Sequence, residues 1–341
     1  MQLNLRLNPD MTDKNIMSAN GSGNAALPLV SVIMSCYREP LDWFSECIDS
    51  VLAQSMADFE LVVIIDDPDN LPLVEKIRSY AAQDVRIKLL INEVNVGLAV
   101  SLNRGISIAS ANIIARMDAD DIAENNRLQT QLDFLDENPN ISLVGTAIKL
   151  IDEQGSIIGS KRYYQDETLL KKIIPYCSIT CHPTWMFRKS LHTKIGGYRD
   201  LFTAQDYDFL YRVLDAGEKI SNIQSSLLRY RVHQQSITGG FSLNRYKVRH
   251  YIHKMHHDRL RLGHDNFDKS TLNEYLQNTK DNSKVSNLLA KLRRTKKHSF
   301  IKKLYYLPQL FVYSKDIRER VYDHLKLKCI LAMHKEVTYD N

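Results

Sequence analysis

The chain has 341 residues, of which 44% are hydrophobic and 25% charged, a composition typical of a globular protein with a full apolar core. No run of about 18 apolar residues is present, so we expect no membrane-spanning helix. The five cysteines lack the spacing of a disulfide framework, which favours reduced thiols and a cytoplasmic location.

Charge is distributed unevenly along the chain. Residues 241–341 hold 22 Lys and Arg against 10 Asp and Glu, a net charge of +12. The other 240 residues hold 23 against 30, a net charge of −7. We therefore expect a flexible leader at 1–28 without a signal peptide, an α/β domain at 29–240, and a basic, mainly helical region at 241–341.

From residue 29 the chain alternates short apolar runs with amphipathic stretches. The runs are β-branched, as in strands buried on both faces, and the stretches between them place apolar residues at helical spacing. Strand and helix are predicted to alternate, beginning with a strand, over 30–34, 40–52, 59–65, 71–82, 85–91, 98–106 and 112–117. This order predicts an α/β fold with a largely parallel sheet flanked by helices.

Polar and acidic residues stand where the predicted strands end. In parallel α/β sheets, ligands bind beyond the carboxyl ends of the strands, so these residues form a candidate ligand site. In strand order they are Ser35, Tyr37 and Glu39, then Asp66 and Asp67, then Asn95 and Gly97, and finally Asp118, Ala119 and Asp120.

Asp118 and Asp120 directly follow a buried strand. Carboxylates two residues apart at a strand end can share a divalent ion, and hard Mg2+ or Mn2+ prefers such oxygen ligands. The alternative is a solvated acidic turn that precedes a helix.

Two further segments have both a ligand-binding and a local structural explanation. Asp66 and Asp67 either form a turn before a proline or accept hydrogen bonds from a nucleotide. Gly97 permits a tight turn before a helix whose N–H groups, together with Arg104, suit a diphosphate. The alternative for this segment is a capped helix with a surface arginine.

Asp206 and His233 are the remaining candidates. Asp206 opens a predicted helix, where an acid is either a helix cap or a general base for an attacking hydroxyl. His233 follows a strand-like segment and is either a metal or phosphate contact or an ordinary loop residue.

Together, eight segments resemble family 2 of the glycosyltransferases, in the bacterial branch that builds polysaccharides and surface glycans. The resemblance covers about residues 28–240 and implies the GT-A nucleotide-diphospho-sugar transferase fold with a mainly helical C-terminal extension. The segments, in the family's order, are 30–37, 59–67, 95–105, 115–121, 182–188, 195–198, 204–209 and 230–238.

The resemblance implies a role for each matching residue. Asp66 contacts the nucleobase, and Asp118 and Asp120 match the D-x-D motif that binds ribose and the metal-diphosphate. Asp206 matches the presumed catalytic base, and His233 stands where relatives carry a diphosphate or metal contact. The residue before Asp206 is glutamine here rather than the family's glutamate, which weakens that assignment.

The implied activity is an inverting, Mn2+- or Mg2+-dependent transfer from a nucleotide-diphospho-sugar, with a UDP-sugar favoured. The acceptor would be a hydroxyl of a glycan or a lipid-linked glycan. The Q-x-x-R-W motif of processive synthases is absent, which favours a non-processive enzyme. A nucleotidyltransferase and a non-catalytic sugar-nucleotide binding protein are the alternatives.

The basic region 241–341 has two explanations. It is either a solvated helical extension or a surface for an anionic membrane, where each basic residue contributes about 1 kcal/mol. Segment 302–311 combines cations with aromatic residues and favours peripheral attachment to the inner face of the cytoplasmic membrane. No nucleic-acid-reading module accompanies the charge, so we expect no nucleic acid partner.

Overall fold

The computed structural model describes residues 16–17, 27–233, 243–278 and 315–334. Its strands are β1 (Ile16–Met17), β2 (Val30–Cys36), β3 (Phe59–Ile65), β4 (Ile87–Ile91), β5 (Ile113–Asp118), β6 (Ile122–Ala123), β7 (Ile141–Ile151), β8 (Ile157–Lys161), β9 (Met186–Arg188) and β10 (Lys219–Arg231). Its helices are α1 (Leu41–Leu52), α2 (Leu71–Gln83), α3 (Leu98–Ile108), α4 (Arg127–Glu137), α5 (Glu167–Ile173), η2 (His182–Thr184), α6 (Lys189–Ile195), α7 (Gln205–Asp215), α8 (Leu243–Leu262), α9 (Lys269–Asn278) and α12 (Lys315–Met333).

The strands form one mixed sheet in the order β1-β4-β3-β2-β5-β9-β7-β10-β6, with β8 paired to β7. The predicted alternation of strands and helices from β2 to β5 is confirmed, and β4, β3, β2 and β5 are parallel neighbours. Their carboxyl ends therefore lie at one edge of the sheet. Ser35 of β2 stands opposite Asp118 of β5 in the register.

The second half of the sheet brings the end of β10 to this same edge. β9 runs antiparallel between β5 and β7, and β10 pairs in parallel with β7. β6 begins just after the turn that follows β5, and it pairs with β10 through Leu228 and Arg229. The chain after residue 229 thus arrives beside the acidic turn at 118–121.

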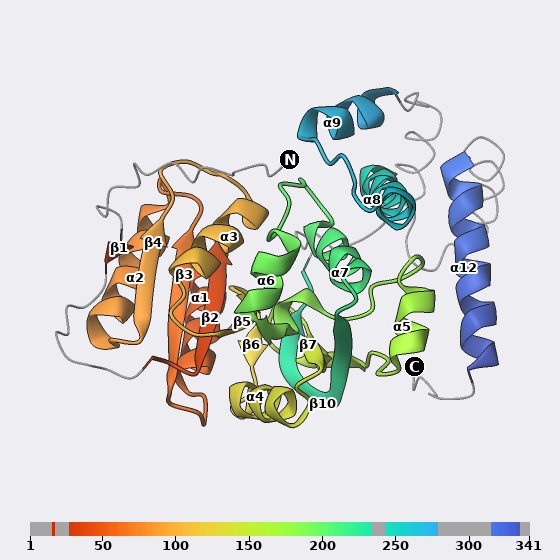
Figure 1. Ribbon diagram of the computed structural model, residues 1–341. Coiled ribbons are helices and arrows are strands. Elements are labelled where there is room, and N and C mark those ends of the chain that lie inside the picture. The colour runs from red at the N-terminus through yellow and green to blue at the C-terminus, as the bar shows by residue number, and fades with distance from the viewer. Residues whose placement is uncertain (1–15, 18–26, 234–242, 279–314, 335–341) are drawn as a thin grey trace, which may run out of the picture.

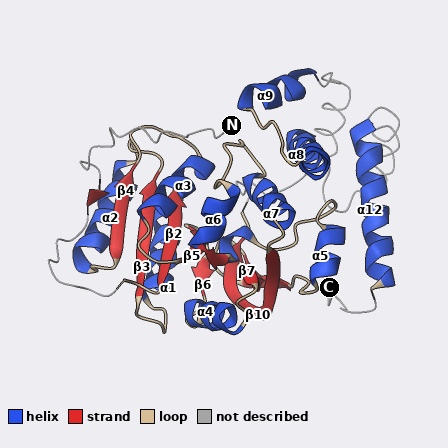
Figure 2. Cartoon of the chain, in the orientation of Figure 1, coloured by secondary structure: helices blue, strands red, loops and turns tan. Residues whose placement is uncertain are grey.

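Helices cover both faces of the sheet and enclose two apolar cores (Figures 1 and 2). Helices α1, α2 and α4 pack on one face, and α3, α5, α6, α7 and α8 pack on the other. Successive side chains of a strand point to opposite faces. In β5, Ala115 and Met117 belong to the first core and Ile114 to the second, which places Arg116 on the second face.

The start of the basic region belongs to the packed body. Helix α8 buries Val248, Tyr251, Ile252 and Met255 in the same core as α7. A solvated extension is therefore the wrong explanation for this helix. Helix α12 lies beside α5 at the far end of the molecule (Figure 1) and packs partly buried leucine and isoleucine side chains against that core.

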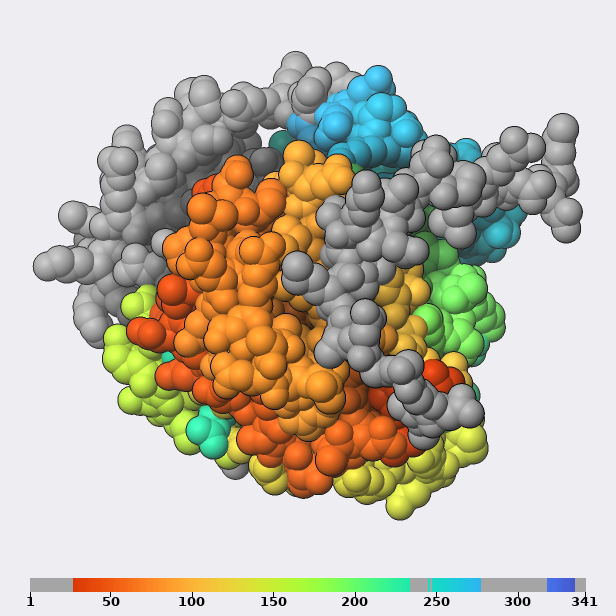
Figure 3. Space-filling model, turned by 90° about the vertical axis from the view of Figure 1, so that its left-hand side faces the viewer, coloured from red at the N-terminus to blue at the C-terminus, as the bar shows by residue number. Residues whose placement is uncertain are grey.

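The opposite end is formed by α2, β4 and the edge strand β1, and Figure 3 views the molecule from this end. Ile16 and Met17 pair antiparallel with β4, so this short part of the predicted flexible leader is attached to the sheet. Within the described ranges, no helix is both long and apolar enough to cross a bilayer.

Candidate active site

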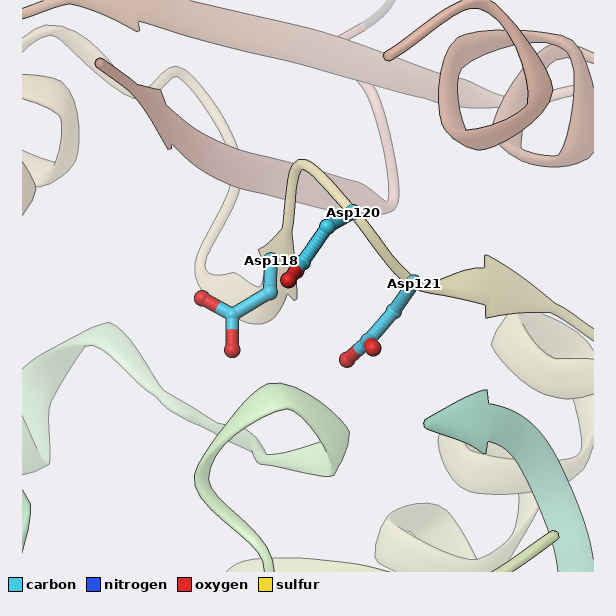
Figure 4. A group of neighbouring side chains, drawn as sticks. All are labelled: Asp118, Asp120 and Asp121. Carbon is cyan, nitrogen blue, oxygen red and sulfur yellow. The ribbon is translucent and has the colours of Figure 1, made fainter. Parts of the chain in front are cut away.

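Three carboxylates gather at the turn between β5 and β6. One ligand oxygen from each of Asp118, Asp120 and Asp121 lies within 4.8 Å of the others. Figure 4 shows all three side chains projecting from this one turn. Asp118 and Asp120 are partly exposed, whereas Asp121 is buried at 1% exposure. The sequence prediction found the first two and missed Asp121, although it follows them directly.

Arg231, at the end of β10, holds the acidic turn in place. Its backbone N–H donates to Asp121 Oδ1 at 2.8 Å, and its Nε donates to the carbonyl of Asp120 at 2.9 Å. Its buried guanidinium also donates to the carbonyl of Glu153 at 3.2 Å and lies 5.0 Å from the centre of the Trp43 ring. Arg231 was not identified from the sequence. Its position at a strand end, two residues before His233, was the only feature of the sequence that pointed to it.

His233 stands at the same turn. Its Nε2 lies 3.0 Å from Asp120 Oδ2, and its ring centre lies 5.0 Å from that of Trp43. The imidazole therefore belongs to the immediate surroundings of the carboxylates.

The electrostatics of the turn favour a bound cation. Burial raises the pKa of Asp121 well above its usual range, and the charges of Asp120 and Asp118 raise it further. Burial and the charge of Asp118 also raise the pKa of Asp120, while His233 opposes the shift. Asp121 Oδ2 is buried and has no hydrogen-bond partner among the described residues. Clustered, destabilised carboxylate oxygens fit a hard divalent cation such as Mg2+ or Mn2+.

The end of β2 adds one more acid beside this turn. Burial raises the pKa of Glu39 to about 7; the hydrogen bond from the Tyr37 amide opposes this rise, and the charges of Asp120 and Asp118 add to it. That bond has a length of 2.8 Å. Ser35, Tyr37 and Glu39 therefore lie along the same sheet edge as the triad.

Asp66 anchors the loop after β4. Its carboxylate is buried and accepts hydrogen bonds from the Asn92 side chain and from the backbone N–H groups of Val96 and Gly97, at 2.8 to 2.9 Å. Arg104 Nη1 donates to Asn92 Oδ1 at 2.7 Å, which joins this predicted residue to the same network. Gly97 has φ +85°, a conformation that favours glycine.

The other predicted residues of this sheet edge make fewer contacts than Asp66. Asp67 Oδ2 accepts from Arg38 Nε at 2.7 Å, and Ala119 is buried between the acidic residues. Asn95 is exposed on the loop before α3. Asn92, which links Asp66 to Arg104, was missed because an isolated asparagine gives no recognisable pattern.

Asp206 opens α7, as predicted, and is half-buried. The preceding Ala204 has φ +61°, a left-handed conformation that is strained for a residue with a side chain. Burial raises the pKa of Asp206, and the Tyr207 amide together with the charges of Arg116 and Arg249 opposes the rise. Arg116 forms an ion pair with Asp118 and lies on the face of the sheet that α7 covers.

The chain is similar in sequence to known proteins. A profile described as "Glycosyl transferase family 2" matches residues 31–196. Over 213 residues the chain is 35% identical to the uncharacterized glycosyltransferase MJ1057 of Methanocaldococcus jannaschii, spanning 62% of this chain and 73% of that protein. It is 33% identical over 234 residues to the O-antigen biosynthesis glycosyltransferase WbnJ of Escherichia coli, spanning 67% and 91%.

The fold is similar to that of a solved structure. The crystal structure of S. aureus TarS 1-349 in complex with UDP-GlcNAc matches 92% of this chain and 93% of that one, with a TM-score of 0.55 and 16% identity. This likeness supports the expected GT-A fold. The sequence relatives decide between the alternatives left open above, in favour of glycosyl transfer over nucleotidyl transfer. The chain is a glycosyltransferase and belongs to glycosyltransferase family 2.

Proposed function

We propose that this chain transfers one hexose per encounter from a UDP-sugar to a hydroxyl of a glycan or lipid-linked glycan, with inversion at the anomeric carbon. The observation that carries the proposal is the cluster of Asp118, Asp120 and Asp121 at the carboxyl edge of the sheet, where Arg116 forms an ion pair with Asp118. Arg116 lies on the face of the sheet that α7 covers, and Asp206 stands at the start of that helix.

The donor lies along the carboxyl edge of β2 to β5. Asp66 contacts the base, with Asp67, Asn95, Gly97 and Arg104 nearby. Asp118, Ala119 and Asp120 face the ribose and diphosphate, alongside Ser35, Tyr37 and Glu39. UDP is favoured because the fold matches a protein solved with UDP-GlcNAc.

The triad, with His233 at its edge, has the ligand chemistry for Mn2+ or Mg2+. Such a cation supplies positive charge that stabilises the departing nucleoside diphosphate.

Asp206 acts as the general base. Its carboxylate accepts the proton of the acceptor hydroxyl while that oxygen attacks the anomeric carbon from the face opposite the diphosphate. The new glycosidic bond forms as the bond to the diphosphate oxygen breaks, so the configuration inverts. Positioning of the two reactants contributes much of the acceleration.

The acceptor is a surface glycan or its lipid-linked precursor, as the O-antigen relative suggests. Residues 241–341 would then hold the enzyme at an anionic membrane on its cytoplasmic side. In the described part of this region, α12 exposes Tyr322 and Leu325 beside the exposed cations Lys326 and Lys328. Segment 302–311, with its cations and aromatic residues, lies outside the described residues.

A thermal-shift panel tests the donor assignment. UDP-, GDP- and dTDP-sugars are each added with Mn2+ or with EDTA, and a ligand at 100 times its dissociation constant adds about 2.7 kcal/mol of apparent stability. We expect a Mn2+-dependent shift with a UDP-sugar. A shift with another nucleotide would overturn the UDP assignment.

Vesicle sedimentation tests the membrane assignment. We expect the full chain to sediment together with anionic vesicles, and a chain that stays in the supernatant would overturn this assignment.

A further inference from the structure

Arg116 is a buried cation whose hydrogen-bonding capacity is only partly used. The residue is 3% exposed and lies on β5, two residues before Asp118. Its Nη2 forms an ion pair with Asp118 Oδ1. Its Nε and Nη1 are buried and have no hydrogen-bond partner among the described residues.

A buried guanidinium with unpartnered N–H groups lowers the stability of the folded protein. A guanidinium carries five N–H donors, and a buried donor without an acceptor loses the hydrogen bonds that water would provide. Most buried polar groups therefore have partners, and an exception calls for a ligand or a functional reason.

Arg127 shows how this chain satisfies a buried guanidinium that has a structural task. It lies on the opposite face of the sheet and is 1% exposed. Its Nε donates to Gln131 Oε1 at 3.0 Å, and its Nη2 donates to the Arg116 carbonyl at 2.5 Å. Its Nη1 faces Met117 Sδ at 3.0 Å. All three nitrogens have a partner, whereas in Arg116 only Nη2 has one.

The charge of Arg116 acts on several buried titratable groups on its side of the sheet. Burial lowers the pKa of His182 well below its usual range, and the charge of Arg116 lowers it further. Burial raises the pKa of Tyr198, whose hydroxyl lies 2.9 Å from His182 Nε2, and Arg116 opposes that rise. The same charge acts on Asp206. Arg116 thus contacts the acidic turn through Asp118 and lies on the sheet face that is covered by α7, the helix at whose start Asp206 stands.

We infer that Arg116 is a donor-binding residue whose Nε and Nη1 donate hydrogen bonds to hydroxyl oxygens of the transferred sugar, while Nη2 orients Asp118. The inference rests on the proposed function and adds a residue and a ligand group to it. The sugar is the part of the donor that must lie between the acidic turn and Asp206. Arg116 precedes the turn along β5 and faces the side of the sheet that α7 covers, so its unpartnered Nε and Nη1 suit the sugar better than the diphosphate.

Binding calorimetry in Mn2+ separates the sugar from the nucleotide. UDP-galactose, UDP-N-acetylglucosamine and UDP are titrated into the full-length wild type, Arg116→Lys and Arg127→Lys. Hydrogen bonds to a charged donor typically change affinity tenfold or more. We expect Arg116→Lys to weaken binding of the preferred UDP-sugar at least tenfold and that of UDP less than threefold. The matched control, Arg127→Lys, should change both affinities less than threefold.

A second variant guards against a failure to fold. Arg116→Met removes the buried charge and leaves a partly exposed Asp118 that water can solvate. It should show the same selective loss, with a native circular dichroism spectrum. Unchanged UDP-sugar affinity in the folded variants would overturn the inference, as would equal losses for UDP and UDP-sugar. If the wild type binds a different nucleotide sugar, the same comparison applies to that pair; if it binds none, the proposed function fails and the inference fails with it.

Discussion

The backbone N–H of Arg231 donates to Asp121 Oδ1 at 2.8 Å, across 110 residues of sequence. This bond joins the last residue of β10 to the turn after β5. The first half of the sheet therefore provides the acidic residues, and the second half fixes their orientation. A cation site at this turn requires both halves to be folded.

We expect Asp118→Asn and Asp120→Asn to have different effects on stability. Breaking a buried ion pair costs about 3–5 kcal/mol, and the partial exposure of Asp118 reduces this to about 2–3 kcal/mol. Asp118→Asn should therefore lower the free energy of unfolding, because Arg116 loses its counter-charge. Asp120→Asn removes one of three clustered negative charges and should stay within about 1 kcal/mol of the wild type. Urea unfolding in EDTA measures both values.

Both substitutions should weaken Mn2+ binding in calorimetry, because each removes a charged oxygen ligand. Equal stability losses would show that the Arg116 ion pair contributes little. Unchanged Mn2+ affinity in both variants would contradict the assignment of the triad to a cation.

Replacement of Asp206 by Asn should separate catalysis from binding. General base catalysis contributes about 10²–10⁴-fold, so kcat should fall at least about 100-fold. The affinity for the UDP-sugar, measured by calorimetry, should stay unchanged. Wild-type transfer by Asp206→Asn would contradict the role of this residue as the base.

The contribution of Asp206 to the stability of the fold should decrease as pH rises above 3.8. Burial raises the folded-state pKa of Asp206 above its ordinary value of 3.8. As pH rises from 3.8, the unfolded chain releases this proton first, so its contribution to stability falls until the folded carboxyl is also ionised. Over the same range kcat/KM should rise, because the base must be ionised. Asp206→Asn should remove this part of the stability change, and a pH series of thermal midpoints for both proteins measures it.

The parallel half of the sheet could be predicted because its strands are apolar, short and separated by amphipathic helices. The positions of Asp66 and Asp118 at the sheet edge follow from that order alone. Arg231 and Asn92 could not be predicted, because their roles depend on contacts across 110 and 26 residues of sequence. A search for motifs also passes over Arg116, since the sequence does not show that its Nε and Nη1 are buried without partners.

The same limitation applies to helix α8. Net charge marks residues 241–341 as different from the rest, yet α8 contributes apolar residues such as Ile252 to the core. Its charged residues include Arg259, which forms an ion pair with Asp215 at 2.6 Å. Composition averages over the exposed and the buried face of a helix, so it cannot reveal this packing.

The buried ion pairs that attach α8 should contribute far more to the free energy of unfolding than exposed ion pairs do. The side chain of Asp265 is 1% exposed and accepts two hydrogen bonds from Arg199 at 2.9 Å, and it also pairs with Arg259. Asp265→Ala leaves two guanidinium groups without their shared partner and should cost about 3–5 kcal/mol. Asp200→Ala, which removes an exposed pair with Lys269, should cost less than about 1 kcal/mol. Similar losses in urea unfolding would show that α8 is not held by this network.

Two glycines on paired strands should respond to alanine with opposite signs. A Cβ at Gly145 of β7 would lie 1.8 Å from Thr180 Oγ1 and 2.7 Å from Asn222 Oδ1, both buried. Overpacking of a core costs about 1–3 kcal/mol or more, so Gly145→Ala should lower the free energy of unfolding by about 3 kcal/mol. A Cβ at Gly159 of β8 would lie 3.6 Å from Leu150 Cδ1, an ordinary contact. Gly159→Ala should therefore stabilise the strand by about 0.5–1 kcal/mol.

The consequence for activity should also differ between the two variants. Thr180 directly precedes the segment from Cys181 to Trp185. The backbone carbonyl of Trp185 accepts a hydrogen bond from the backbone N–H of Arg116 at 2.8 Å. An alanine at Gly145 displaces Thr180 and with it the support of Arg116, so sugar-nucleotide affinity should fall together with stability. Gly159→Ala has no such connection and should keep wild-type affinity. Full affinity in a folded Gly145→Ala protein would show that the 180–185 segment can shift without moving Arg116.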